Sequence, residues 1–341
     1  MGLRTEEFDY PLPKEFIAQH PETDRAGSRM LVLRRDDGSM EHRRFSDVVE
    51  FLRPHDVVVI NDTKVLPARL KGRKPTGGAL DILLVEKIDG ERWTCLVDGA
   101  KKGAAAFDAT VDDVPVRLER EGRFWRIDFL GASADEVMAR CGSMPLPHYI
   151  RREENGHAGM DVERYQTIYA ERLGSIAAAT AGLHFTEGLL DRIRQMGVTV
   201  LKITLHIGVG TFFLVKTEQV EEHRMHREYY KVEPELTARL RDAKARGGRV
   251  FAVGTSATRT LETLFSQNGS GSHEGYTELF IHPGYVFKAV DGLITNFHLP
   301  RSTPLLLVCA FAGRENIFEA YRQAMALSYR FYSYGDAMLV L

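Results

Sequence analysis

The chain has 341 residues, of which 44% are hydrophobic and 27% are charged, a composition typical of a folded globular protein and unlike that of disordered, collagenous or coiled-coil chains. The length is sufficient for about two domains. Lys and Arg total 45 against 47 Asp and Glu, and the net charge of -2 excludes a uniformly basic nucleic-acid-coating protein but permits a local basic patch.

The cysteines and the N-terminal segment indicate the compartment. Cys95, Cys141 and Cys309 are odd in number, far apart and in no CxxC spacing, which excludes a disulfide framework and a cysteine-based zinc cluster. The segment MGLRTEEFDYPLPKE lacks the apolar run of a signal peptide, and no stretch approaches the ~18 apolar residues of a membrane span. We therefore expect a cytoplasmic protein without a membrane segment.

The texture of the sequence changes at about Leu66. Residues 31–64 end in the apolar run VVVI followed by NDTK, which predicts a strand of a sheet. From Leu66 to Pro147 short strands and turns follow one another, including ALDILLVEKI, RWTCLV and the alternating VPVRL and WRIDF, which the Glu121-Gly122 turn joins as a hairpin. This stretch predicts a separate all-β domain, inserted into the chain.

The insertion is expected to end with a short helix. Ser133 and Glu136 have the spacing of a capping box, and Gly142 follows as a C-terminal stop. The proline-rich PLPHYI then predicts a linker that returns to the main domain.

After this linker, predicted helices alternate with predicted strands. In chain order they are the helix DVERYQTIYAERL, a helix from Thr186 to Met196 stopped by Gly197, the strand VTVLKITL, a helix from Pro234 to Gly247-Gly248, the strand RVFAVG and a helix from near Ser256. This alternation predicts a layered α/β sheet with parallel pairs. The expected division is an α/β main domain of residues 1–65 and 148–341 with an all-β domain of residues 66–147, and SQNGSGSHEG at 266–275 reads as an exposed flexible loop.

Five histidines of the helix-rich half suggest one site; they are His184, His206, His223, His226 and His298. The motif HRMH could place His223 and His226 on one helical face as metal ligands. However, there is no HExxH motif and no supporting cysteine pair. We therefore expect no metal, and prefer surface or RNA-facing roles for these two histidines.

Two glycine-containing segments follow predicted strands. In LHIGVGTF, Gly208 and Gly210 could let a ligand approach the backbone, although a tight turn explains them equally well. The third glycine of a dinucleotide fingerprint is replaced by Phe213, which argues against a nicotinamide enzyme.

In AVGTSATRTLE a strand ends at Gly254 and a helix begins, so that free N–H groups could bind a carboxylate or phosphate. Thr255 and Ser256 add hydroxyl groups, and Arg259 and Glu262 follow on the same helix. Ordinary capping by one of the two hydroxyl groups is the competing interpretation.

Polar residues also occur within apolar stretches near the end of the chain. SIAAATAGLHFT contains Thr180 and His184, DGLITNFHLPRST contains Asn296, His298 and Arg301, and the tail YRFYSYGDAMLVL contains Asp336. Because burying an unpaired polar side chain is costly, their clustering beside Gly and Pro turns favours a site, although each alone could be a satisfied core residue.

Taken together, these segments resemble a known family. The resemblance is carried by FDYPLPKEFIAQHP, SRMLVL, NDTKVLPARL, YQTIYA, TAGLHFT, LHIGVGTF, EHRMHREYY, AVGTSATRTLE, PGYVFKAVDGLITNFHLPRST and YRFYSYGDAML. The chain resembles the S-adenosylmethionine:tRNA ribosyltransferase-isomerase family of bacterial queuosine biosynthesis. The departures from the family pattern, Ala179, Leu214, His148 and Pro304, remove no reactive group.

The resemblance implies an α/β domain with an inserted antiparallel β-barrel domain. It implies transfer and isomerisation of the ribosyl unit of S-adenosylmethionine onto 7-aminomethyl-7-deazaguanine at the tRNA wobble position, giving epoxyqueuosine, adenine and methionine. It also implies tRNAs with a GUN anticodon, S-adenosylmethionine as co-substrate, no metal and no obligate protein partner. A methyltransferase that uses S-adenosylmethionine and a non-catalytic RNA-binding protein are the alternatives.

The implied chemistry needs a general base and a general acid, because the sulfonium acidifies the adjacent 5′ carbon and adenine must depart. The candidates are His206 and His298 with Glu262 and Asp336, and each histidine could instead be structural. The candidate substrate-binding residues are Asp62 for the guanine-like edge, Lys64 and Arg69 for phosphates, and Thr180, His184, Gly208, Gly210, Gly254, Thr255, Arg259, Asn296 and Arg301. A charged turn after the strand VVVI explains Asp62, Lys64 and Arg69 equally well. Lys64, Arg69, Arg259 and Arg301 are also the candidate basic patch.

Overall fold

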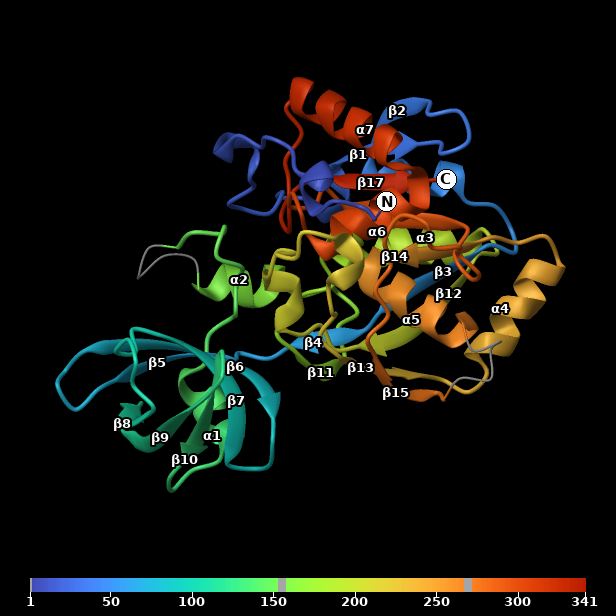
Figure 1. Ribbon diagram of the computed structural model, residues 1–341. Helices are drawn as coiled ribbons and strands as arrows, with labels where there is room; N and C mark the ends of the chain where they lie inside the picture. The colour runs from blue at the N-terminus through green and yellow to red at the C-terminus, as the bar shows by residue number, and fades with distance from the viewer. Residues whose placement is uncertain (1, 153–157, 267–271) are drawn as a thin grey trace.

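The computed structural model describes residues 2–152, 158–266 and 272–341, and residues 267–271, half of the loop expected at 266–275, lie outside these ranges (Figure 1). In the described part, one large sheet dominates the main domain. Its strands in spatial order are β15 (Glu274–Thr277), β13 (Glu228–Val232), β12 (Thr199–Leu205), β3 (Val57–Asn61), β14 (Val250–Val253), β16 (Gly292–Asn296), β17 (Ala337–Val340), β1 (Arg29–Leu33) and β2 (Met40–Arg44).

The centre of this sheet is a block of parallel strands. β12 and β14 flank β3 in parallel, with Val57 facing both Thr199 and Val250, and β16 is parallel to β14. The outer pairs β12–β13, β13–β15, β16–β17 and β1–β2 are antiparallel. The carboxyl ends of four central strands therefore lie at the same edge of the sheet.

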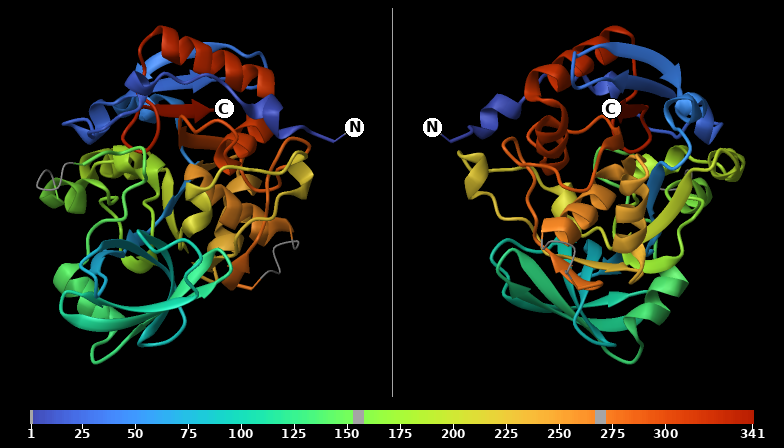
Figure 2. Two further views of the ribbon diagram at one scale, coloured as in Figure 1. Left: turned by 60° about the vertical axis from the view of Figure 1, so that its left-hand side comes forward. Right: turned by 90° about the vertical axis from the view of Figure 1, so that its right-hand side faces the viewer.

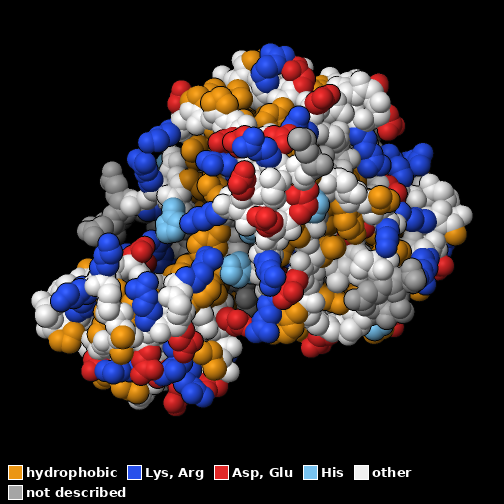
Figure 3. All heavy atoms as spheres, in the orientation of Figure 1, with side chains coloured by type: hydrophobic (Ala, Val, Ile, Leu, Met, Phe, Trp, Pro, Cys, Tyr) orange, Lys and Arg blue, Asp and Glu red, His pale blue; other side chains and the backbone are white. Residues whose placement is uncertain are grey.

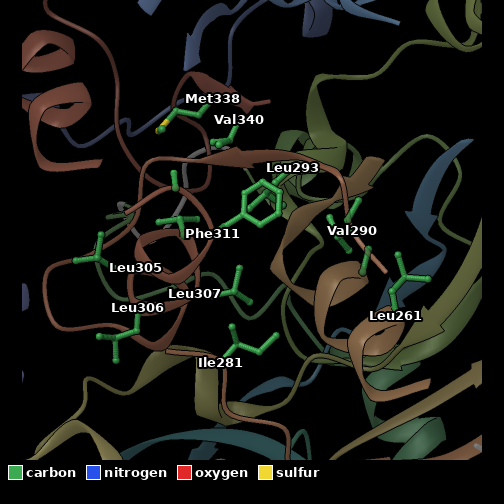
Figure 4. Close-up of a cluster of buried hydrophobic side chains, with 14 of the residues drawn as sticks. Leu261, Ile281, Val290, Leu293, Leu305, Leu306, Leu307, Phe311, Met338 and Val340 are labelled. Atoms are coloured by element: carbon green, nitrogen blue, oxygen red, sulfur yellow. The ribbon is translucent and has the colours of Figure 1, made fainter. Parts of the chain in front are cut away.

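Both faces of the sheet are covered, which explains why β3 is apolar from Val57 to Ile60. Val57 and Val59 belong to one core cluster, and Val58 and Ile60 belong to the other, as the alternation of a strand requires. The first cluster includes side chains from α4 (Leu236–Ala245), α5 (Gly254–Ser266), α6 (Thr303–Ala312) and α7 (Arg314–Ala326), and the second from α3 (Glu187–Gln195) and the 3-10 helix η4 (Phe45–Phe51). Figure 4 shows part of the first cluster, in which sheet residues such as Leu293 and Val340 meet Phe311 of α6.

The insertion forms a closed antiparallel barrel that lies beside the main domain (Figure 2). Around the barrel the strands are β10 (Phe124–Phe129), β7 (Arg92–Asp98), β6 (Ala79–Lys87), β5 (Arg69–Arg73), β8 (Ala106–Val111) and β9 (Val114–Glu121). All of its pairs are antiparallel. The expected fold class, a layered α/β domain with an inserted antiparallel barrel, is therefore confirmed.

Local signals in the insertion are confirmed in detail. β9 and β10 form the expected hairpin, and Gly122 in its turn has a φ of 64°. The helix α1 (Ala134–Cys141) begins with a capping box, because the Ser133 hydroxyl accepts from the N–H of Glu136 at 3.2 Å and the Glu136 carboxylate accepts from the N–H of Ser133 at 2.8 Å. Gly142 follows the helix as expected.

The helix expected over DVERYQTIYAERL is only partly correct. The helix α2 (Ala158–Arg164) ends before Tyr165, and β11 (Arg172–Ser175) pairs with β4 (Thr63–Val65) where helix was expected. The Gln166 side chain explains why the helix ends early. It accepts from the N–H and donates to the carbonyl of Val65, both at 3.0 Å, and so makes the two hydrogen bonds that a neighbouring strand would make with β4. This tertiary contact outweighs the local helical pattern.

The remaining short helices connect these elements. They are the 3-10 helices η1 (Thr5–Phe8), η2 (Lys14–Phe16), η3 (Arg25–Gly27), η5 (Thr180–His184), η6 (Val209–Phe212) and η7 (Val220–Glu222). In the described ranges no helix is both long enough and apolar enough to cross a membrane.

The barrel touches the main domain at several points besides the chain connections. The Arg123 guanidinium lies 3.9 Å from the ring centroid of Phe213, and Arg227 forms an ion pair with Glu86 at 2.8 Å. Val209 of the main domain belongs to the core cluster of the barrel. The separate folding of residues 66–147 remains our proposal.

We expect Leu118→Ala to destabilise the barrel by about 2–5 kcal/mol, because Leu118 is fully buried in its core and truncation leaves a cavity. The matched change Leu293→Ala should act on the sheet core of the main domain instead. Hydrogen exchange resolved by peptide should show faster exchange in the barrel for the first variant and in the main domain for the second. Equal acceleration of both parts in both variants would mean that the chain opens as one unit.

Candidate active site

A cavity of about 430 Å³ opens at the edge where the four parallel strands end. Ile207 follows β12, Gly254 follows β14, and Asn296 is the last residue of β16, and all three line the cavity. Loops 147–149, 177–181, 279–281 and 332–333 complete the wall. This size is suitable for a small molecule, since such sites usually measure roughly 300–1,000 Å³.

One part of the cavity wall carries a buried ion pair. Glu228 of β13 is 5% exposed and Arg259 of α5 is 7% exposed, and the Arg259 guanidinium donates to the Glu228 carboxylate. The other Glu228 oxygen accepts from the N–H of Gly208 at 2.8 Å, and Arg259 also donates to the carbonyl of Leu279 at 3.0 Å. Both charges are therefore held in fixed positions with satisfied partners.

The N-terminus of α5 reaches the same cavity. Gly254 has a φ of 87°, which favours glycine, and Thr255 and Ser256 line the wall beside it. The Ser256 hydroxyl accepts from the Asn61 side chain at 3.1 Å, so it ties the helix to β3. The free N–H groups and the positive end of the helix dipole favour a negatively charged ligand group here.

His298 lies on the cavity wall as a neutral imidazole. Its Nε2 forms a 2.7 Å hydrogen bond with the Thr295 hydroxyl, and its backbone N–H donates to the Tyr321 hydroxyl at 2.9 Å. Burial lowers the pKa of His298 to about 3. A proton on Nε2, donated to Thr295, leaves Nδ1 with a lone pair that can accept a proton.

Behind the wall, His184 holds Asn296. Asn296 Nδ2 donates to His184 Nε2 at 3.1 Å, so the histidine proton is on Nδ1, which donates to the Ser28 hydroxyl at 2.8 Å. Burial, aided by Arg330 and Arg25, lowers the pKa of His184 to about 3. His184 itself does not line the cavity, and it acts on the wall through Asn296.

Tyrosines form the wall next to Asn296. The Tyr149 and Tyr332 rings lie 4.7 Å apart, and the Tyr149 hydroxyl bonds the Ser333 hydroxyl at 2.7 Å. Tyr165 also lines the cavity. Burial raises the pKa of Tyr149 to about 12, so this part of the wall is neutral.

Six of the expected site residues line the cavity: Thr180, Gly254, Thr255, Arg259, Asn296 and His298. They come from three segments that the sequence separates by up to 118 positions, Thr180 to His298. The expectation that polar residues beside Gly and Pro turns belong to one site agrees with this placement. Their roles in binding or catalysis remain proposals.

His206 lies elsewhere. Ile207 faces the cavity, so its neighbour in the extended chain points away from it. His206 Nδ1 bonds the Thr63 hydroxyl at 2.8 Å, and the ring stacks on Tyr229 with centroids 5.4 Å apart. Burial, aided by Arg172, lowers the pKa of His206. We therefore correct the expectation that His206 acts beside His298.

Neither expected carboxylate faces the cavity. The fully buried Glu262 accepts from the N–H groups of Lys288, Ala289 and Val290 and from the Tyr285 hydroxyl, all at 2.9–3.1 Å. Asp336 is 2% exposed and accepts from the N–H groups of Arg29 and Arg330 and from the Arg29 guanidinium. Both carboxylates hold loops in place, and neither is free to move a substrate proton.

The expectation for the residues that would bind the base and the phosphates also needs correction. Asp62 is buried outside the cavity, where it accepts from the Thr204 hydroxyl at 2.6 Å, and burial raises its pKa. Arg69 lies in the barrel and makes 2.9 Å hydrogen bonds to Asp81. Of this group, Lys64 remains exposed on β4.

The other expected residues lie near the cavity without lining it. Gly208 contributes its N–H to Glu228, and Gly210 packs close to His226. Arg301 neighbours the wall residue Ser302 and forms an exposed ion pair with Asp9 at 3.2 Å. These three positions support the cavity rim, whereas contact with a ligand was expected.

Glu228 and the tyrosines are the site residues that the sequence reasoning missed. A signal for Glu228 was present, because Glu228, Tyr230 and Val232 alternate as the buried positions of β13. An acid at an inward position of a strand indicates a paired buried charge. Tyr149 and Tyr332 carried no such signal, since buried tyrosines are common in any core.

The motif HRMH does not form a helical metal site. Residues 223–227 are irregular, and His226 lies against the rings of Phe124 and Phe213. Among the described residues, no group of three or more His, Cys, Asp or Glu side chains is placed to hold a metal ion.

Comparison with known proteins gives consistent matches over nearly the full length of the chain. Residues 5–340 match the family described as "Queuosine biosynthesis protein". The S-adenosylmethionine:tRNA ribosyltransferase-isomerases of Pelotomaculum thermopropionicum and Symbiobacterium thermophilum are each 48% identical over 99% of this chain and 100% of their own length. The crystal structure of S-adenosylmethionine tRNA ribosyltransferase from Thermotoga maritima matches with a TM-score of 0.56 and 36% identity, over 98% of this chain and 100% of that chain.

The neutral state of His184 predicts a pH dependence of stability. Its pKa of about 3 in the folded protein is below the usual 6.5, so between these values the unfolded chain binds a proton that the folded chain does not. The free energy of unfolding should therefore fall as the pH drops below about 6.5, by up to about 1.4 kcal/mol per pH unit from this residue. The free energy of unfolding can be measured by urea titration at several pH values from ~7 to ~5. It should fall less steeply with decreasing pH in His184→Gln than in the parent protein, and an equal decrease in both would contradict a neutral His184.

Proposed function

Because the chain belongs to the family of queuosine biosynthesis proteins, we propose that it is an S-adenosylmethionine:tRNA ribosyltransferase-isomerase. It transfers and isomerises the ribosyl moiety of S-adenosylmethionine onto 7-aminomethyl-7-deazaguanine at the tRNA wobble position. The products are epoxyqueuosine-tRNA, adenine and methionine.

The cavity at the end of the parallel strands is the observation that carries the proposal. It has fixed opposite charges in Glu228 and Arg259, a helix N-terminus at Gly254 and a neutral aromatic wall around Tyr149. S-adenosylmethionine has the matching parts, namely a zwitterionic amino acid, a cationic sulfonium and a neutral purine. A wall with charged groups in one part and neutral aromatic groups in another thus fits a molecule with a charged end and a neutral end.

In the proposed reaction the substrate supplies its own activation. The sulfonium acidifies the 5′ carbon of the ribose and later leaves as the thioether of methionine, which is why no metal or redox cofactor is required. We assign proton transfer to His298, whose neutral imidazole can accept a proton at Nδ1 while Nε2 is bonded to Thr295. Glu228, the carboxylate on the wall among the described residues, is paired with Arg259, and we assign it to holding that guanidinium at the cavity wall.

We further propose that the tRNA substrates have a GUN anticodon, and that the enzyme works in the cytoplasm without an obligate protein partner. The tRNA backbone needs positive charge, and Figure 3 shows Lys and Arg side chains where the barrel meets the main domain. Arg259 and Arg69 are held by Glu228 and Asp81 in buried or half-buried ion pairs. Lys64 is exposed, and the ion pair of Arg301 with Asp9 is exposed to solvent, so the proposed phosphate contacts are Lys64 and Arg301.

The released small molecules distinguish this function from its rivals. Incubated with S-adenosylmethionine and tRNA that carries the aminomethyl precursor, the enzyme should release adenine and methionine, which chromatography separates. A methyltransferase would release S-adenosylhomocysteine, and a non-catalytic RNA-binding protein would leave S-adenosylmethionine intact. Either of these results would reject the proposal.

His298→Ala should lower turnover by ~10²–10⁴ while leaving the affinities for S-adenosylmethionine and tRNA nearly unchanged, since general acid–base catalysis is typically of that size. Single-turnover kinetics and separate binding titrations provide the measurements. His273→Gln is the control, because His273 is exposed and does not line the cavity. Turnover within a few-fold of the parent would rule out His298 as the proton-transfer group.

Lys64→Ala and Arg301→Ala should each reduce the salt dependence of tRNA affinity, because a lost phosphate contact releases about one counterion fewer. The slope of log affinity against log salt should become shallower by about one unit in each variant. Arg322→Ala on α7 serves as the control, since Arg322 pairs with Glu319 on the same helix. Slopes equal to that of the control would exclude both residues as phosphate contacts.

A further inference from the structure

Asn296 presents an acceptor that the protein leaves unused. The residue is 2% exposed and lines the cavity, and its Nδ2 donates to His184 Nε2 at 3.1 Å and to the Tyr332 carbonyl at 3.4 Å. Its Oδ1 is buried and has no hydrogen-bond partner among the described residues. Since buried amide oxygens are normally hydrogen-bonded, we expect this oxygen to accept a hydrogen bond from a bound ligand.

The orientation of this amide is determined by its surroundings. A rotated amide would place Oδ1 against the Tyr332 carbonyl, where two acceptors would repel. The Ser28 hydroxyl donates to the Arg25 carbonyl at 3.4 Å, so it accepts from His184 Nδ1. The Nε2 of His184 therefore carries only a lone pair and requires a donor from Asn296. Both neighbours therefore demand the NH₂ group, and the oxygen is the atom left for a ligand.

The chemistry around Asn296 selects the kind of donor. The fixed charges of the wall, Glu228 and Arg259, come from β13 and α5, and they suit the carboxylate and ammonium of an amino acid. At Asn296 the oxygen is uncharged and His184 is neutral, so an ammonium would lose its hydration without gaining a negative partner. A neutral N–H donor fits this position better.

The aromatic side chains beside Asn296 suit a flat ring. Tyr332 bonds Asn296 through its carbonyl, and its ring lies 4.7 Å from that of Tyr149. Both rings line the cavity. A purine placed against these rings would have its exocyclic amine within reach of the Asn296 oxygen, and aromatic contact stabilises such a ring.

We propose that Asn296 Oδ1 accepts a hydrogen bond from the 6-amino group of the adenine of S-adenosylmethionine, and that His184 is the positioning residue that keeps this oxygen facing the ligand. The inference rests on the proposed function, since it names how that co-substrate is selected. It gives Asn296 the role of distinguishing adenine from a purine with a 6-oxo group, which offers an acceptor where the site requires a donor.

The test compares the binding of two ligands without tRNA. Calorimetry measures the affinity for S-adenosylmethionine and for its analogue with hypoxanthine in place of adenine. The parent protein should prefer S-adenosylmethionine by at least about 30-fold, because the analogue leaves Oδ1 unpaired and faces it with another oxygen. In Asn296→Ala the preference should fall to within about 3-fold. Asn316→Ala is the matched control, since Asn316 also donates to two carbonyls, those of Arg35 and Ala312, but does not line the cavity.

His184→Leu tests the positioning role separately. Without the Nε2 lone pair the amide can rotate, so the preference should fall below about 10-fold although Asn296 is still present. A merely structural histidine would lower thermal stability and weaken both ligands equally, which leaves their ratio unchanged. If this variant does not fold, Asn296→Ala alone decides the assignment of the acceptor.

Two outcomes would overturn the inference while the proposed function stands. One is a parent-like preference in Asn296→Ala. The other is that Asn296→Ala removes discrimination against an analogue that lacks the α-amino group, which would place the ammonium at this oxygen. Failure of the parent to bind S-adenosylmethionine at all would instead overturn the proposed function, and the inference with it.

Discussion

The parallel arrangement of β12, β3, β14 and β16 is the constraint on which the site depends. It brings the residues after four strands to one edge, where the last backbone groups lack a sheet neighbour. At the centre of the sheet, the side chain of the fully buried Asn61 pairs with these backbone groups. Its oxygen accepts from the N–H groups of Leu205 and Thr63, and its NH₂ donates to the Leu205 carbonyl and the Ser256 hydroxyl. The ends of β3 and β12 are thus hydrogen-bonded through Asn61 to Ser256 of α5, which lines the cavity.

Electrostatics in the cavity follow from burial. The charges that remain, on Glu228 and Arg259, neutralise each other and are held by backbone groups, while His298 and His184 are kept uncharged. A cationic substrate therefore enters a wall that carries no unpaired positive charge from histidine. This arrangement suits chemistry in which the sulfonium of the substrate, rather than a group of the protein, provides the activation.

Besides the linker 147–149, residues 209–214 connect the barrel to the site. Phe213 contacts Arg123 of the barrel, and its neighbours Thr211 and Leu214 line the cavity. Val209, just before them, packs into the core of the barrel. Residues 209–214 therefore contact both the barrel and the cavity.

The sequence by itself determined the local elements: the capping box of α1, the β9–β10 hairpin and the alternation of strands with helices, because each depends on neighbours within a few residues. It also identified Asn296 and His298, since polar residues in an apolar stretch are visible without a fold.

Only the tertiary structure decided which polar residue faces the cavity. Glu262 is satisfied by backbone groups 26–28 residues away, and His206 is turned away by the alternation of an extended chain, while Gln166 ends a helix by pairing with Val65 across 101 positions. Such contacts arise from folding and leave no local pattern.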